Sequence, residues 1–376
     1  MRVTVVTTWL PTTVAPSSGS FVVRDCRAIA RAGQEVRIVH LVPPHQDDGT
    51  RRVTVEGLPV VRVPMRPASP ASVAKAAAAL PRLVEGTDVV HSMAMSSLLP
   101  LTLLDCAGVL TAPWVHTEHW SGLTNPGTLS LPLRAGRVLV SSALRRPDVV
   151  TAVCEYLAAP VRACRAEAPV VVVPCIVDPQ GEPVPRRGER PGGDLDGTLR
   201  LVTVGGLVER KDPLACLEVL AGLVSRDVEA TMTFVGEGPL RAAIEARAAQ
   251  PDLAGRVRLT GTLDAAGVRE ELARADLFLG PTRGDNFFVS AAEAIVAGRP
   301  VVVSDAGGQT EYVEEGNGSI VAAGAAPAAW ADAVVETRDR LAGASAAEVA
   351  ATIGERFSTP VVGAAYRAVH EQVVGS

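Results

Sequence analysis

Residues 281–300 read PTRGDNFFVSAAEAIVAGRP and lie between two short apolar runs. The first run ends at Gly280, and a loop carrying Asp285 follows it. Asn286 is suited to cap a helix that ends at about Ala297, with Gly298 directly after it. The next apolar run begins after Pro300. A strand, a helix and a second strand in this order predict two parallel strands joined by a helical crossover.

The same alternation recurs along the whole chain. In the first half, apolar and β-branched runs predict strands at Val3–Thr7, Val36–Val42, Val60–Val63, Val89–His91, Trp114–Thr117, Val149–Ala152 and Val170–Val173. In the second half they predict strands at Leu201–Val204, Met232–Val235, Val257–Leu259, Leu277–Leu279 and Val301–Ser304. The predicted fold class is α/β, with two doubly wound Rossmann-like domains facing each other across a cleft.

A segment rich in proline, glycine and charge separates the two halves. It spans 179–198 and is typical of a linker or a long surface loop. We therefore expect a first domain at 1–178, a second at 199–358, and a last helical segment at 359–376.

Composition restricts the class of protein. The chain has 376 residues, of which 47% are hydrophobic, and a net charge of −5, which favours a globular protein and gives no reason to expect a nucleic-acid partner. No apolar run is long enough to span a membrane, and no secretory signal is evident, so we expect a cytoplasmic protein. The six cysteines form no C-x-x-C pair, and we expect no metal site from them.

Two carboxylates in the 281–300 stretch are candidates for ligand binding. Asp285 precedes a helix N-terminus, whose free amides attract phosphate, and Glu293 follows eight positions later. Ionised carboxylates accept hydrogen bonds from hydroxyls, so the pair suits a ligand rich in hydroxyl groups. The alternative is an acid that complements the helix dipole and an unrelated surface glutamate.

The sequence resembles the family-4 retaining glycosyltransferases of the GT-B fold. Asp285-x7-Glu293, the G-R-P-V-V run that begins at Gly298 and the G-G-x-x-E run that ends at Glu311 resemble that family's donor site. Further matches, in the same order as in the family, are Val173–Asp178, Val204–Lys211, Val235–Leu240, Val257–Gly261 and Ala275–Asp276.

The resemblance implies roles for residues of the second domain, which would hold the nucleotide sugar. Lys211 matches the lysine that binds the donor diphosphate, and it is one of only two lysines, the other being Lys75. Glu293 matches the residue that holds the ribose hydroxyls. Asp285 matches the acid that faces the transferred sugar, where glutamate is usual.

The second domain also departs from the family pattern. Gly205-Gly206 stands where glycine-arginine is usual, so a second phosphate-binding cation is missing at Gly206. Arg210 is a candidate replacement, although we expect adjacent side chains to point in different directions. Phe287-Phe288 stands where phenylalanine-glycine is usual, and the amides of residues Asn286, Phe287, Phe288 and Val289 are expected to face the hexose or phosphate.

The first domain would bind the acceptor and complete the donor site. Gly19 matches the glycine that lets the loop after the first strand approach the donor phosphates, or it is an ordinary turn glycine. His119 matches the histidine that contacts the donor sugar, with a structural histidine as the alternative. His116 is a weaker candidate for acceptor binding. The last helix is expected to cross back onto the first domain.

Together these features predict a retaining glycosyltransferase that uses a nucleotide-sugar donor, with UDP-sugar preferred, and a small-molecule or glycan acceptor. The resemblance implies no cofactor and no metal. The D-x-D motif at Asp194 and Asp196 lies in the predicted linker, so solvated surface carboxylates are a better interpretation than a metal site. The apolar, arginine-containing segment 131–146 is predicted to form an amphipathic core helix, and weak peripheral membrane contact is the alternative. A non-catalytic sugar-nucleotide-binding protein is the alternative function, supported by the missing arginine.

Overall fold

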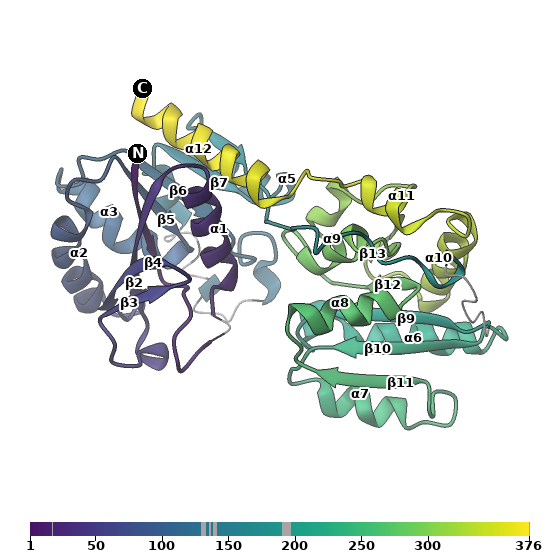
Figure 1. Ribbon diagram of the computed structural model, residues 1–376. Helices are drawn as coiled ribbons and strands as arrows, with labels where there is room; N and C mark the ends of the chain where they lie inside the picture. The colour runs from purple at the N-terminus through teal and green to yellow at the C-terminus, as the bar shows by residue number, and fades with distance from the viewer. Residues whose placement is uncertain (17, 129–132, 135–136, 138–140, 190–196, 376) are drawn as a thin grey trace. The chain divides into compact units, whose positions relative to one another are not determined.

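The computed structural model describes all residues except 17, 129–132, 135–136, 138–140, 190–196 and 376. The chain divides into two compact units (Figure 1). Unit 1 comprises Met1–Ile176 and Ser358–Ser376, and unit 2 comprises Val177–Phe357. Each unit is a parallel-sheet α/β structure, which confirms the predicted Rossmann-like fold class.

Unit 1 is built on an eight-stranded sheet with the order β3-β4-β2-β1-β5-β6-β7-β8. Its strands are β1 (Arg2–Thr7), β2 (Glu35–Val42), β3 (Arg52–Val55), β4 (Leu58–Pro64), β5 (Val89–Met93), β6 (Trp114–Glu118), β7 (Val149–Ala152) and β8 (Val170–Val172). All neighbours pair in parallel except β3, which forms an antiparallel hairpin with β4. The sequence prediction missed β3, although Glu56-Gly57, both at positive φ, form the two-residue turn that such a hairpin needs.

The helices of unit 1 include the last one of the chain. They are α1 (Ser20–Arg31), α2 (Pro70–Val84), α3 (Leu98–Cys106), α5 (Glu155–Arg165) and α12 (Thr359–Gly375). Helix α12 packs along α1, and its apolar side chains belong to the same core as strands β1 and β2. Helix α12 therefore completes the fold of unit 1.

Unit 2 contains a six-stranded parallel sheet with the order β11-β10-β9-β12-β13-β14. Its strands are β9 (Leu199–Val204), β10 (Ala230–Val235), β11 (Val257–Gly261), β12 (Leu277–Gly280), β13 (Val301–Ser304) and β14 (Gly318–Val321). Its helices are α6 (Pro213–Val224), α7 (Arg241–Ala248), α8 (Ala265–Arg274), α9 (Val289–Val296), α10 (Pro327–Arg340) and α11 (Ala346–Ala351). Strand β14 was not predicted, because it is short and begins with glycine.

The described part of segment 179–198 packs against the rest of unit 2. Arg187 forms an ion pair with Asp276, with 2.7 Å between Nη2 and Oδ2. The buried guanidinium of Arg299 donates to the carbonyl of Val184 at 2.7 Å. These contacts hold a Pro- and Gly-rich stretch against a folded unit.

Segment 131–146 lies partly outside the described residues. Of those described, Leu133 is exposed and Leu144 is fully buried. In the part of the chain that the structure describes, no helix has the length and apolar character needed to cross a bilayer.

A chain of buried polar side chains joins α12 to the sheet of unit 1. His370 of α12 lies between Gln34 and His91, with 3.0 Å from each ring nitrogen to its partner atom. His91 then contacts Thr117 of β6 at 2.6 Å. All hydrogen bonds in this row of side chains can form when both imidazoles are neutral, because each ring then has one donor and one acceptor. Burial accordingly lowers the pKa of His370 to about 4.

We expect acidification to destabilise unit 1 through His370. Its pKa is lower in the folded chain than the ordinary value of 6.5, so its stabilising contribution is present above pH 6.5 and is lost as pH falls toward 4. Chemical denaturation of wild type and His370→Gln between pH 7.5 and 4.5 should show a shallower loss of unfolding free energy in the variant. Parallel pH profiles would contradict this account.

Close packing of α12 on α1 depends on Gly363. A Cβ at this position would lie 2.6 Å from the carbonyl oxygen of Ala28. We therefore expect Gly363→Ala to separate the helices and cost about 1–3 kcal/mol of unfolding free energy. Gly375→Ala, in the same helix but with no atom within 4 Å of the added Cβ, is the control and should leave the melting temperature nearly unchanged. Equal melting temperatures for both variants would refute the packing argument.

Candidate active site

The principal charged cluster of unit 2 lies where two neighbouring strands end. Lys211 belongs to the 3-10 turn η6 (Glu209–Lys211), which follows β9, and Asp285 follows β12. Strands β9 and β12 are adjacent, and the strand order of the sheet reverses direction between them. Parallel α/β sheets bind ligands at such a switch point, beyond the carboxyl ends of the strands.

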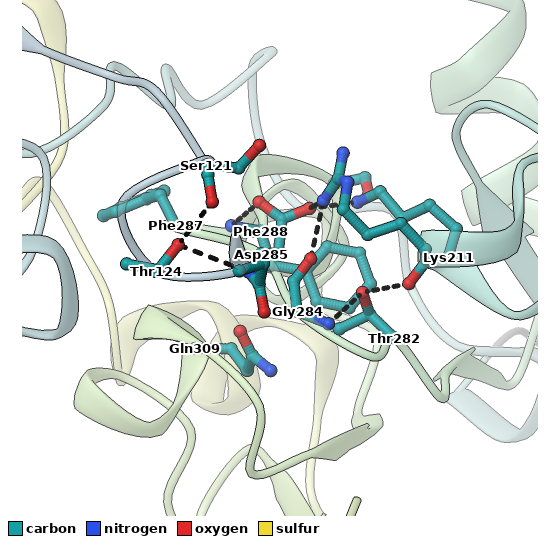
Figure 2. Close-up of polar contacts among 12 residues, drawn as sticks. Ser121, Thr124, Lys211, Thr282, Gly284, Asp285, Phe287, Phe288 and Gln309 are labelled. Atoms are coloured by element: carbon teal, nitrogen blue, oxygen red, sulfur yellow. Dashed lines mark hydrogen bonds and ion pairs between the residues drawn. The ribbon is translucent and has the colours of Figure 1, made fainter. Parts of the chain in front are cut away.

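Two cations share one carboxylate at this point. Nζ of Lys211 lies 2.5 Å from Oδ2 of Asp285, and Nη1 of Arg210 lies 3.0 Å from the same oxygen (Figure 2 shows the lysine and the carboxylate). The expectation that the side chains of residues 210 and 211 point apart is wrong. Both residues lie in the tight turn η6, and the long Arg210 side chain reaches back to Asp285 and to the carbonyl of Gly284 at 2.7 Å.

The cluster keeps its charges at neutral pH. Burial by itself would raise the pKa of Asp285, but the charges of Lys211 and Arg210 and their hydrogen bonds lower it to about 2. Burial lowers the pKa of Lys211, and Asp285 offsets part of that effect. Because two cations face one anion, the three side chains carry one surplus positive charge, which suits an anionic ligand.

Asp285 also bonds to the backbone just before helix α9. Its Oδ1 accepts a hydrogen bond from the backbone N–H of Phe288 at 3.1 Å. The N-cap of α9 is Phe288, at φ 58°, so the prediction that Asn286 caps this helix is wrong. Consequently the amide of Phe288, one of those expected to face the donor, is already occupied by Asp285. Glu293 lies one turn into α9 and is half-buried.

The aromatic pair after Asp285 serves mainly as packing. Phe287 and Phe288 are 5% and 2% exposed, and their rings contact Tyr312 and Phe278 respectively. The Nζ of Lys211 lies over the Phe288 ring, 3.9 Å from its centre, and this cation–π contact stabilises the position of the ammonium group. We infer that the Phe288 ring, which replaces the family's usual glycine, helps to position the lysine.

Three positions that hold the cluster were not singled out from the sequence. The hydroxyl of Thr282 donates to the carbonyl of Arg210 at 3.0 Å, and the hydroxyl of Tyr312 donates to the carbonyl of Phe288 at 2.8 Å. Gly307 allows the chain to pass Asp285, since a Cβ there would lie 2.0 Å from the Asp285 carbonyl oxygen. Gly307 and Tyr312 lie in and just after the G-G-x-x-E run, which was the available signal.

Gly205 and Gly206, expected at the donor site, follow β9 directly. Gly205 has φ +147°, and a Cβ on it would lie 3.7 Å from Cε of Lys211, so the lysine stem passes close to this glycine. In the described parts of the chain, no group of three or more His, Cys, Asp or Glu side chains is placed to hold a metal ion. Asp194 and Asp196 lie outside the described residues.

In unit 1, Gly19 is the N-cap of α1 and has a left-handed conformation at φ +66°. A Cβ on Gly19 would lie 2.3 Å from the backbone carbonyl of Trp9. The loop after β1 therefore closes on itself at this residue. That contact gives a structural reason for glycine here, whatever ligand approaches the loop.

The two candidate histidines have different environments. His119 follows β6, and its Nε2 lies 3.6 Å from Oδ2 of Asp25. His116 is fully buried, and its ring nitrogens contact Ser92 at 2.8 Å and Glu118 at 3.2 Å. The expected acceptor contact of His116 does not fit this geometry, because both nitrogens are engaged inside the unit.

Two parallel-sheet α/β units in one chain, as found here, are the architecture of the GT-B fold. Residues 18–175 match the family model of the glycosyl transferase 4-like domain, and residues 198–339 match that of glycosyl transferases group 1. The chain belongs to this glycosyltransferase family, which confirms the resemblance found in the sequence.

Individual relatives agree with the family. The chain is 30% identical to 2-deoxystreptamine glucosyltransferase of Streptomyces kanamyceticus, over 58% of this chain and 59% of the relative. It is 31% identical to D-inositol 3-phosphate glycosyltransferase of Frankia alni, over 68% and 65%. The match thus spans under two thirds of each relative. Anabaena HepE, solved in complex with UDP, has a TM-score of 0.76 at 16% identity, over 99% and 100%, and shares the fold.

Substitution of Gly19, in the loop after β1, should lower the unfolding free energy strongly. We expect Gly19→Ala to displace the Trp9 backbone and to cost clearly more unfolding free energy than Gly108→Ala. Gly108 has the same φ of +66° but no atom within 4 Å of an added Cβ, so that variant measures the conformational cost alone, about 1 kcal/mol. Chemical denaturation of both variants provides the comparison, and equal losses would show that the loop contact is unimportant.

Proposed function

We propose that the protein is a retaining glycosyltransferase that transfers a sugar from a nucleotide-diphosphate donor to a hydroxyl or amine of a small-molecule or glycan acceptor. The proposal rests above all on the Lys211–Arg210–Asp285 cluster at the switch point of unit 2. A fixed pair of cations is suited to a diphosphate, the group that must leave during sugar transfer.

Arg210 is the proposed second phosphate-binding cation. Its guanidinium contacts the same Asp285 oxygen as the Lys211 ammonium. The carboxylate therefore holds the two cations side by side without any ligand. Preorganised charge of this kind lowers the barrier because it needs no rearrangement as negative charge develops. The missing arginine at Gly206 therefore gives little support to a non-catalytic sugar-nucleotide-binding protein.

Our proposed mechanism keeps the anomeric configuration. The bond between the sugar carbon and the donor diphosphate breaks, and the acceptor oxygen or nitrogen bonds to that carbon on the same face. The acceptor proton passes to the leaving diphosphate, whose charge Lys211 and Arg210 stabilise. Asp285 and His119 orient the sugar, Glu293 holds the ribose, and Gly19 allows backbone approach to the phosphates, as the resemblance implies. No metal is required in this scheme, so we expect activity to survive a chelator.

Relatives support a choice of substrates to test. Two relatives are a 2-deoxystreptamine glucosyltransferase and a D-inositol 3-phosphate glycosyltransferase, and both named compounds are substituted cyclohexane polyols. The HepE complex contains UDP. We therefore propose a UDP-sugar donor and a cyclitol or cyclitol-containing acceptor.

A thermal-shift panel of UDP-, GDP- and dTDP-sugars tests the donor assignment. A cognate donor at 100 times its dissociation constant should stabilise the fold by about 2.7 kcal/mol, and UDP-sugars are expected to give the largest shift. Product analysis with 2-deoxystreptamine or an inositol phosphate as acceptor then tests transfer. Donor binding without transfer or slow donor hydrolysis would favour the non-catalytic alternative.

Removal of the donor-binding side chains should reduce activity strongly. We expect Lys211→Ala, Arg210→Ala and Glu293→Ala each to lower kcat/KM at least ~10-fold, equivalent to about 1.4 kcal/mol of transition-state stabilisation. Lys75→Ala is the matched control, because Lys75 is the only other lysine and is exposed on α2 of unit 1. Wild-type kinetics in a folded Lys211→Ala enzyme would reject the site.

A further inference from the structure

Helix α1 contacts the His119 imidazole at two places. Oδ2 of Asp25 lies 3.6 Å from Nε2 of His119, and both side chains are almost completely buried, at 4% and 8% exposure. One turn earlier, the Phe21 ring packs against the imidazole with 4.7 Å between ring centres. The ring is therefore held on one face by an aromatic side chain and at Nε2 by a carboxyl group.

Asp25 is itself fixed by the C-terminal helix. The hydroxyl of Tyr366, on α12, hydrogen-bonds with Asp25 and also with Thr117 of β6. Tyr366 is fully buried. Oδ2 of Asp25, the oxygen nearest His119, has no hydrogen-bond partner among the described residues. The carboxyl group thus has one oxygen available for the imidazole.

We propose that Asp25 is a positioning residue that determines which nitrogen of His119 carries the proton. This inference rests on the proposed role of His119 as the contact of the transferred sugar. An ionised Asp25 accepts a hydrogen bond from Nε2–H, which leaves Nδ1 as an acceptor. A protonated Asp25 donates to Nε2, which leaves Nδ1–H as a donor. The separation of 3.6 Å is longer than a hydrogen bond, and hydrogen bonds among catalytic groups can tighten when substrate binds.

Burial of the Asp25 carboxyl group places this change near neutral pH. Burial raises the pKa of Asp25 to about 7, partly opposed by the Tyr366 hydrogen bond and the charge of Arg24. Burial lowers the pKa of His119 to about 4, so its ring stays neutral while Asp25 titrates.

Several other ionisable groups face this pair. Burial holds the pKa of His91 on β5 well below its ordinary value, so this imidazole stays neutral. Burial raises the pKa values of Cys26 and Tyr366, so both remain neutral in this range. Arg24 lies beside Asp25 on α1 and keeps its positive charge. His116 and Glu118 of β6 are paired with each other. The change in the proton on His119 between pH 6 and 8 should therefore follow Asp25.

Nitrogen NMR of the full-length protein tests this directly. The His119 ring signals, assigned by their loss in His119→Gln, should shift with a midpoint near pH 7 in wild type, with Nε2–H favoured at high pH. Asp25→Asn, similar in shape but unable to ionise, should lose this midpoint. His370→Gln is the control: it removes a buried polar group of the same unit that does not contact His119, and should keep the midpoint.

Kinetics provide the second readout. We expect Asp25→Asn to lower kcat about 10-fold with donor KM within twofold, and to flatten the pH dependence of kcat between pH 6 and 8. An unchanged His119 titration in folded Asp25→Asn would overturn the inference, even if sugar transfer is confirmed. Should no donor and acceptor pair react, the proposed function fails, whereas the NMR titration still decides whether Asp25 controls the imidazole.

Discussion

The Asp285 carboxylate is the contact on which the site of unit 2 depends. One of its oxygens holds both Lys211 and Arg210, and the other accepts the backbone N–H of Phe288, the residue before α9. A single side chain therefore links the turn after β9 to the loop after β12. Because burial would favour a neutral acid, the two cations are what keep this group ionised, and the carboxylate in turn keeps two like charges close together.

Glycines allow close contacts in the loops that follow the strands of both units. Gly307 allows the chain after β13 to pass the Asp285 backbone, and Gly205 leaves room for the stem of Lys211. Gly19 does the same for the loop after β1 of unit 1. At Gly307 and Gly19 the neighbouring backbone approaches more closely than a residue with a Cβ permits, whereas the Lys211 stem lies at ordinary van der Waals distance from Gly205. The φ angle is positive at all three glycines. Loops at the carboxyl ends of the strands can thereby present amides and side chains together.

Two aspartates illustrate how environment selects chemistry. Asp285 lies beside two cations and stays ionised far below neutral pH, whereas Asp25 lies among a tyrosine, an imidazole and apolar side chains, and ionises near neutrality. The first is suited to holding fixed charge for a diphosphate, and the second to setting the hydrogen-bond character of an imidazole. Pairs of acids with separated pKa values commonly have different roles in one enzyme. Tyr366 connects the second aspartate to α12, so the last helix of the chain contributes to the surroundings of His119.

The sequence by itself determined the two α/β units, nearly all of their strands and the membership of the glycosyltransferase family, because apolar periodicity and ordered glycine, proline and acid spacings are local signals. It also indicated Lys211, Asp285 and Glu293 as candidates. Only the tertiary structure decided that Arg210 turns to the same carboxylate, that Phe288 rather than Asn286 is the N-cap of α9, and that His116 is enclosed. The Asp25–His119 contact joins residues 94 positions apart through the packing of α1, β6 and α12. Such contacts depend on side-chain rotamers and on which buried polar groups find partners, and neither is encoded in spacing along the chain.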